Sequence, residues 1–240
     1  MYLSDLHTHT IASGHGTVCT ITDMAKAAAG KGLKLLGITD HGPATLAAAS
    51  PSYYRSLTFA PRKRFGLEVM YGAECSILDT DGRLDLEEEL LGILDYSIVS
   101  MHANCYSSAG KEKNTRAFLL AAEHTGVRIL GHPDDPRFPL DYDLLIREAK
   151  QIGVVPEINE ASLRPGSYRG DTRPCCRQIL QSCMKYGCPV LLSSDSHGPA
   201  HVGDFTWAAA FVHEQIFPEE LILNNRIRRR TKRLSWPGIT

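Results

Sequence analysis

The stretch Asp5-Leu6-His7-Thr8-His9 decides how this chain is expected to fold and work. Residues 1–6 form a short apolar segment, which predicts a strand. Alternate side chains of a strand point to the same face, so His7 and His9 would present two imidazoles side by side. That geometry suits a metal ion. One His-x-His pair is weak evidence, because a solvated or buried histidine is the more common explanation.

The composition is that of an ordinary globular protein. The 240 residues are 43% hydrophobic and 22% charged, enough for one large core, and we expect a single domain over residues 1–240. The formal net charge of −1 gives no overall attraction to nucleic acid or to an anionic membrane. No segment approaches 18 uncharged apolar residues and no signal-peptide pattern opens the chain, so a cytoplasmic protein is expected.

Short apolar segments alternate with helical patterns about seven times along the chain. The expected strands are residues 1–6, 33–38, 68–71, 96–99, 127–130, 154–158 and 190–192. The expected helices are residues 24–29, 114–124, 141–152, 174–186 and 207–213, with another after Pro218. Continuous apolar strands are typical of a parallel sheet that is buried on both faces. The alternation therefore predicts a closed β/α barrel.

Several connections also carry local signals. Thr22 or Asp23 is expected to cap the first helix. Residues 43–64 show no clean period and predict a long irregular loop, and residues 77–86 predict a hairpin around an Asp-Gly turn. The basic segment 226–233 is expected to be a solvated helix end.

Side chains of the types that bind metals follow six of the seven expected strands. They are His7 and His9, Asp40 and His41, Glu74, His102, His132, and Asp195 with His197. In a β/α barrel the carboxyl ends of the strands converge on one mouth, so these residues would share a pocket. Burying so many ionisable groups is costly without a counter-charge, and bound cations are the ordinary solution. Imidazole and carboxylate ligands without thiolates suit Zn, Mn or Fe.

The ordered motifs D-L-H-T-H-T, T-D-H-G, G-A-E, S-M-H, G-H-P and S-S-D-S-H resemble those of the PHP (polymerase and histidinol phosphatase) family. The resemblance extends from Asp5 to His197 and is greatest to the YcdX-type stand-alone phosphoesterases. It implies a distorted seven-stranded TIM-like (β/α)7 barrel with three divalent metal ions. Zinc is expected first, with Mn or Fe as alternatives.

The resemblance also implies how the ligands divide among the three ions. The first ion would be bound by His7, His9, Glu74 and Asp195, the second by Glu74, His102 and His132, and the third by His15, His41 and His197. Spacing alone would not have selected His15. Asp5, Asp40 and Asn159 are expected to support these ligands by hydrogen bonds, although direct metal binding by Asp40 is an equal alternative.

The expected reaction is hydrolysis of a small-molecule phosphate ester by a hydroxide that bridges the metals. Glu74, Asp195 and His197 are the expected catalytic residues. The proton for the leaving oxygen would come from His197, Asp195 or a metal-bound water. Contacts to the phosphate or the leaving group are expected from four cations in loops that follow ligand-bearing strands, namely Lys111, Lys113, Arg164 and Arg169.

Three alternatives compete with this interpretation. An amidohydrolase would normally have a bridging lysine and a lone aspartate after the last strand, whereas this chain has Glu74 and an Asp-Ser-His motif. A nuclease that acts on nucleic-acid ends is disfavoured by the near-zero net charge, although the basic tail supports it. A non-enzymatic metal-storage, metal-sensing or structural site would more typically be coordinatively closed and use thiolates.

Overall fold

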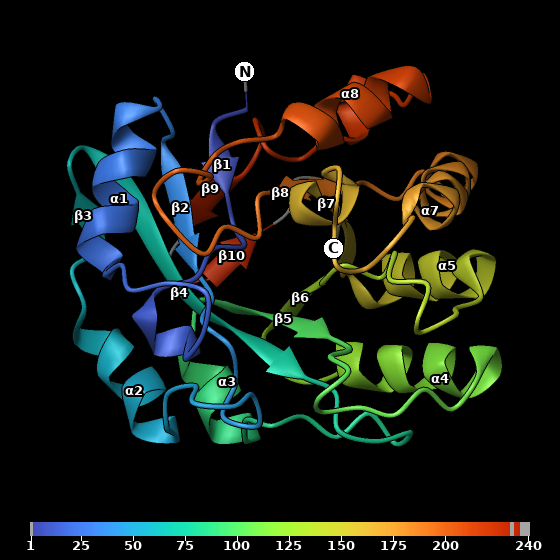
Figure 1. The fold of residues 1–240 in the computed structure, drawn as a ribbon, viewed down its shortest axis with the longest axis horizontal. Helices are drawn as coiled ribbons and strands as arrows, with labels where there is room; N and C mark the ends of the chain where they lie inside the picture. Colours follow the sequence, from blue (N-terminus) through green and yellow to red (C-terminus); the bar gives the residue numbers. More distant parts are fainter. Residues whose placement is uncertain (1, 231–232, 236–240) are drawn as a thin grey trace.

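The computed structural model describes residues 2–230 and 233–235. Its centre is a sheet of parallel strands in the order β1-β2-β4-β5-β6-β7-β8, surrounded by helices (Figure 1). These strands are β1 (Ser4–Asp5), β2 (Leu35–Ile38), β4 (Leu67–Ser76), β5 (Tyr96–Ser100), β6 (Val127–Leu130), β7 (Val155–Asn159) and β8 (Leu191–Ser193). A short strand, β3 (Lys63–Arg64), pairs antiparallel with β4. All seven strands predicted from apolar runs are therefore confirmed.

The helices cover the outside of this sheet, and α5 packs against α4 and α7 along one side (Figure 1). The α-helices are α1 (Ile21–Gly30), α2 (Pro51–Ser56), α3 (Glu88–Ile93), α4 (Lys111–Ala122), α5 (Tyr142–Ile152), α6 (Glu160–Leu163), α7 (Arg173–Tyr186) and α8 (Thr206–Glu214). Short 3-10 helices are η1 (Ile11–Ser13), η2 (Leu57–Phe59) and η3 (Glu219–Leu221). Among the described helices, none is long and apolar enough to cross a membrane.

The first and last strands of the sheet are joined indirectly, which makes the barrel nearly closed. Just beyond the two strand ends, the backbone N–H of His9 donates to the carbonyl of Ser196 at 2.8 Å. At the opposite end, the side-chain amide of Asn224 donates to the carbonyls of Ser4, at 2.9 Å, and Leu192, at 2.7 Å. Asn224 thus satisfies backbone groups at the seam that no strand covers.

A compact apolar cluster fills the barrel interior below the carboxyl ends of the strands. It contains Leu6, Leu35, Met70, Tyr96, Ile98, Ile129, Val155, Leu191, Leu223 and Ile227. The hydroxyl of Tyr96 donates to the carbonyl of Leu6 at 2.6 Å, and a side chain at position 37 would collide with it, so only Gly37 fits there. Because side chains fill the interior, the barrel is a rigid support and the space for a ligand lies at its mouth.

Two local predictions were wrong, and a third is confirmed. Thr20, not Thr22 or Asp23, caps α1, and Asp23 completes a reciprocal capping box with it. The predicted loop 43–64 contains α2, η2 and β3, because Pro51 begins a helical turn whose Tyr54 is fully buried. The hairpin predicted at 77–86 is confirmed by the antiparallel pairing of Ile77 with Leu84.

The end of the chain also differs from the prediction. After Pro218 comes the 3-10 helix η3, and β9 (Arg228–Arg230) then pairs antiparallel with β10 (Arg233–Ser235). Residues 228–230 of the basic segment are therefore extended and paired with another strand, not helical as predicted. Residues 231 and 232 of this segment lie outside the described residues.

Candidate metal centre

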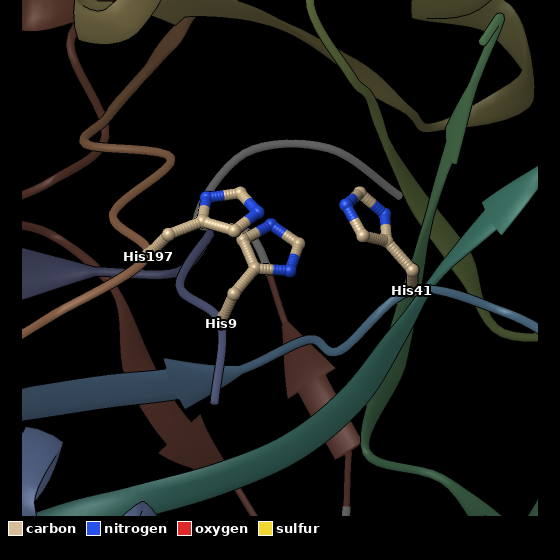
Figure 2. A group of neighbouring side chains, drawn as sticks. All are labelled: His9, His41 and His197. Atoms are coloured by element: carbon tan, nitrogen blue, oxygen red, sulfur yellow. The ribbon is translucent and has the colours of Figure 1, made fainter. Parts of the chain in front are cut away.

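Seven of the ten histidines gather with two carboxylates at the barrel mouth. They are His7, His9, His15, His41, His102, His132 and His197, with Glu74 and Asp195. Figure 2 shows His9, His41 and His197 approaching one another from three separate segments. The carboxyl ends of parallel strands, or the residues just beyond them, supply most of the set. All nine residues expected to bind metal therefore lie in one cluster.

Glu74 lies at the centre of the cluster and is fully buried. Its Oε1 lies 2.8 Å from Nε2 of His132 and 3.2 Å from Nε2 of His102. Its Oε2 lies 2.7 Å from Nδ1 of His41 and 3.3 Å from Nε2 of His7. The two oxygens of one carboxylate thus face two different sets of imidazoles, as a bridging ligand would.

Asp195 forms the second acidic point of the cluster. Its Oδ1 lies 3.3 Å from Nε2 of His9 and 3.7 Å from Nε2 of His7. Its Oδ2 accepts hydrogen bonds from Arg169 at 3.0 Å and Asn159 at 3.1 Å. The backbone φ of Asp195 is +51°, an uncommon value for a residue with a side chain. The surrounding contacts therefore hold this carboxylate in a specific orientation.

Many of the buried atoms facing the centre of the cluster make no hydrogen bond of acceptable geometry, even where a carboxylate oxygen lies close. They include Nε2 of His7, His9, His102 and His197, Nδ1 of His41, and Oε2 of Glu74. A buried polar atom without a partner costs about 1–3 kcal/mol, so such a concentration is unfavourable unless another ligand satisfies it. Three triads have donor atoms within 4.8 Å of one another: His7–His9–Asp195, His41–Glu74–His102 and His9–His41–His197. The donor set therefore fits divalent metal ions.

Hydrogen bonds outside the cluster determine which nitrogen of His9 faces inward. The hydroxyl of Ser13 donates its single hydrogen to Oδ1 of Asp40 at 2.7 Å. The hydroxyl oxygen of Ser13 lies 2.8 Å from Nδ1 of His9 and must therefore accept the proton of that nitrogen. His9 is thus held as the tautomer whose Nε2 lone pair faces the cluster. Asp40 also accepts a hydrogen bond from Tyr53 at 2.6 Å.

Glu157 plays the same part for His7, and the sequence interpretation missed it. Its Oε1 lies 2.7 Å from Nδ1 of His7, while its Oε2 accepts the backbone N–H of His132 at 2.6 Å. Asn159 donates to the same Oε2 at 3.0 Å and so links Glu157 to Asp195. A carboxylate in the middle of a buried apolar strand was the signal that could have identified Glu157.

The expected supporting role of Asp5 takes a different form. Its Oδ1 accepts the backbone N–H of Ser194 at 3.2 Å, and its Oδ2 accepts that of Gly203 at 2.7 Å. Asp5 therefore secures the loop that carries Asp195 instead of touching an imidazole.

The electrostatic environment gives His9 and Glu74 the protonation states that metal ligands need. Burial lowers the pKa of His9 well below its ordinary value, and the nearby His197 and His41 lower it further. Burial alone would raise the pKa of Glu74, but His7 and His102 outweigh that effect and hold it well below its usual range. Neutral imidazoles and ionised carboxylates are the forms that bind cations.

His7 differs from His9 in this respect. Burial disfavours its charged form, but Glu157, Glu74 and Asp195 together raise the pKa of His7 well above its ordinary value. Three carboxylates around one imidazole represent an excess of negative charge that a cation would relieve.

A cavity of about 700 Å³ opens over the cluster. His15, His41, His102, Asp195 and His197 line it together with Gly14, Gly16, Thr45, Leu46, Ala47, Ala103, Asn104, Arg137, Ala161, Tyr168 and Arg169. His15 is exposed and its ring stacks 4.8 Å from that of His41, which places it at the opening. A small molecule could therefore reach the cluster from solvent.

The four cations expected to contact substrate are distributed differently. Arg169 lines the cavity, is 4% exposed and pairs with Asp195. Arg164 instead lies 3.6 Å from Asp204 and does not line the cavity. Lys111 and Lys113 lie in the first turn of α4, not in a loop as expected, and also lie outside the cavity lining. The positions of Arg164, Lys111 and Lys113 therefore do not support the substrate contacts expected of them.

The fold and the cluster together define a metal-binding β/α-barrel protein. Comparison with known families narrows this class, because the PHP domain model matches residues 5–152. A relative from Clostridium acetobutylicum named "Probable phosphatase" is 37% identical over 240 residues, covering 99% of this chain and 96% of its own length. Another with that name, from Caldanaerobacter subterraneus, is 39% identical over 93% of this chain and 87% of its own. The chain therefore belongs to the PHP domain family.

Solved structures share this fold. Histidinol phosphate phosphatase from Lactococcus lactis, complexed with zinc, L-histidinol and phosphate, aligns with a TM-score of 0.63 and 16% identity, covering 98% of this chain and 99% of that chain. A chain from the crystal structures of the metal-dependent tyrosine phosphatases YwqE of Bacillus subtilis and CpsB of Streptococcus pneumoniae aligns with a TM-score of 0.50 and 18% identity, covering 91% of this chain and 89% of that chain. The expected seven-stranded barrel of the PHP type is thereby confirmed, whereas the YcdX-type subgroup stays a prediction.

Proposed function

We propose that this chain is a metal-dependent phosphoesterase that hydrolyses a small-molecule phosphate ester with three divalent ions. The observation that carries the proposal is the convergence of buried imidazole nitrogens on the two oxygens of Glu74, beneath an open cavity. Relatives that cover almost the whole chain bear the name phosphatase, which supports the same reaction class. Zinc is the first candidate, since it accompanies the Lactococcus lactis enzyme of the same fold.

Three groups of ligands would hold the ions. His7, His9 and Asp195 would share the first ion with Glu74, and Glu74 would share the second with His102 and His132. His15, His41 and His197 would hold the third. His41 lies close both to Glu74, at 2.7 Å, and to the ring of His9, at 4.4 Å. It would therefore connect the third group of ligands to the residues that would hold the first ion.

When bound, such ions would neutralise phosphate charge and supply a hydroxide nucleophile from water at neutral pH. Arg169 would add a fixed positive charge at the cavity wall, because its guanidinium is held by Asp195 at 3.0 Å and by Ser162 at 3.1 Å. Asp195 presents Oδ1 to the cluster while Arg169 and Asn159 hold Oδ2. Burial alone would raise the pKa of Asp195, but His7, His9 and Arg169 hold it well below its ordinary value, so Asp195 would stay ionised and water at the cluster would give the leaving oxygen its proton.

Hydrolysis of 4-nitrophenyl phosphate tests this proposal. Protein purified without chelator should release 4-nitrophenol, lose that activity after chelation, and regain it on addition of Zn²⁺ or Mn²⁺. Hydrolysis in H₂¹⁸O should place the label in the released phosphate, because the nucleophile is water and attacks phosphorus. Activity that survives complete metal removal would contradict the proposal, as would fully metallated protein that hydrolyses no phosphate ester.

A further inference from the structure

Beyond the cluster, the cavity has one cationic feature that the proposed reaction does not use. Arg137 lines it next to Tyr168 and Arg169, whereas Leu46 and Ala47 supply apolar surface. Leu46 is 84% exposed, so a bound molecule could cover it favourably. The lining therefore suits a leaving group with an apolar body and a polar end.

Arg137 is oriented before any ligand binds. Its Nε lies 2.9 Å from Oδ1 of Asp135, and its Nη2 lies 2.5 Å from Oδ2 of the same residue. Asp135 is buried, so this bidentate ion pair fixes one edge of the guanidinium. Among the described residues, Nη1 of Arg137 has no hydrogen-bond partner. The arginine thus has a free donor group and lies in a wall of the cavity.

The ring of Tyr168 contacts both Arg137 and Arg169. The Tyr168 ring centroid lies 4.7 Å from the guanidinium carbon of Arg169 and 5.2 Å from that of Arg137. Arg169 in turn contacts Asp195 in the cluster at 3.0 Å. Arg137 therefore lies in the same cavity wall as Arg169, which reaches the cluster, so one bound molecule could contact both Arg137 and the cluster.

We propose that Arg137 recognises a second anionic group on the substrate, so that the preferred phosphate esters have an anionic leaving group. This inference rests on the proposed phosphoesterase function and names its substrate class. Because Asp135 neutralises part of the charge and Arg137 is partly exposed, the preference should be several-fold, not absolute. Neutral leaving groups would still react.

The test compares 4-carboxyphenyl phosphate with phenyl phosphate in the metal-loaded wild type and in Arg137→Gln. Each substrate is compared between the two proteins, so differences in leaving-group reactivity cancel. We expect Arg137→Gln to lower kcat/KM for 4-carboxyphenyl phosphate about fivefold, mainly through KM, and to leave phenyl phosphate nearly unchanged. Arg137→Lys keeps the charge but loses the planar guanidinium, so its kcat/KM for 4-carboxyphenyl phosphate should lie between those of the wild type and Arg137→Gln.

Arg116→Gln is the matched control, because Arg116 is exposed on α4 and does not line the cavity. It should not change the ratio between the two substrates. Equal loss for both substrates in Arg137→Gln would overturn the inference while leaving the phosphoesterase function intact. Failure of the metal-loaded wild type to hydrolyse either ester would instead overturn the proposed function and the inference with it.

Discussion

Nδ1 of His7 lies 2.7 Å from Oε1 of Glu157, and both side chains are completely buried. The carboxylate accepts the Nδ1 proton, so Nε2 is the nitrogen of His7 that faces the centre of the cluster, where a metal ion would replace its proton. Such carboxylate–histidine pairs orient metal-binding imidazoles and raise their basicity. The cluster thus depends on residues that would not themselves touch a metal.

Replacement of Glu157 by glutamine should weaken metal binding roughly 10- to 100-fold without unfolding the barrel. The glutamine side chain would keep nearly the same shape but would lose the charge that holds His7. Competition with a chromophoric chelator measures the affinity, and circular dichroism checks the fold. Glu112→Gln, on the exposed first turn of α4, is the control. Wild-type metal affinity in Glu157→Gln would contradict this role.

Ser13→Ala should release His9 from its fixed tautomer. The Ser13 hydroxyl links Nδ1 of His9 to Asp40, and alanine removes both hydrogen bonds. We expect about tenfold weaker metal binding. In the metal-free protein, ¹⁵N NMR should show a mixture of His9 tautomers. Ser107→Ala, at an exposed position, should change neither measurement. A single unchanged tautomer in Ser13→Ala would show that Ser13 does not set it.

The sequence predicted the strands and most of the cluster for the same reason. A buried parallel strand must be apolar along its length, so a histidine or carboxylate directly after it stands out. His102 follows its strand in this way, and Glu74 lies inside the unusually long β4. His15 follows no strand and enters the site only because the loop after η1 folds back over His41. A local sequence pattern cannot predict that this loop folds back over the site.

Residues that loops bring into the cavity wall were harder to predict. Arg137 and Tyr168 are 31 positions apart in sequence, and only the packing of their loops brings them into one cavity wall. Lys111 looked equivalent to Arg169 because both follow ligand-bearing strands, yet it begins α4 instead. Secondary-structure patterns place such residues near the mouth but cannot determine which way a loop turns them.

Arg169 and Lys113 should therefore differ in their effects on turnover. Arg169→Gln removes a buried charge that contacts Asp195 at 3.0 Å and should lower kcat/KM on the order of 100-fold. Lys113→Gln should have no measurable effect, since Lys113 is exposed outside the cavity. Steady-state kinetics on 4-nitrophenyl phosphate measures both. Equal losses in the two variants would assign substrate binding to a different surface.

Asp85 should make stability depend on pH. Burial raises its pKa to about 6, although the N–H groups of Ala44 and Ser76 oppose the shift. Because the folded-state pKa lies above the ordinary value of 3.8, folding favours the protonated carboxyl, and stability falls as the pH rises from about 4 to about 6.

Asp85→Asn cannot titrate and should lack this component of the pH dependence. Relative to wild type, the variant should gain about 2–3 kcal/mol in unfolding free energy between pH 4 and pH 6. Urea unfolding at several pH values measures the difference. Parallel stability profiles for the two proteins would rule out a raised pKa at Asp85.

The most direct test of the account is the metal content of the wild type and of Glu74→Ala, measured by elemental analysis after purification without chelator. Glu74 contacts His7, His41, His102 and His132, so its removal should take away a ligand shared by two ions. The account predicts close to three metals per wild-type chain, and a folded but inactive Glu74→Ala protein that holds at most one. Equal metal content in the two proteins, or full activity in Glu74→Ala, would contradict a cluster built around this carboxylate.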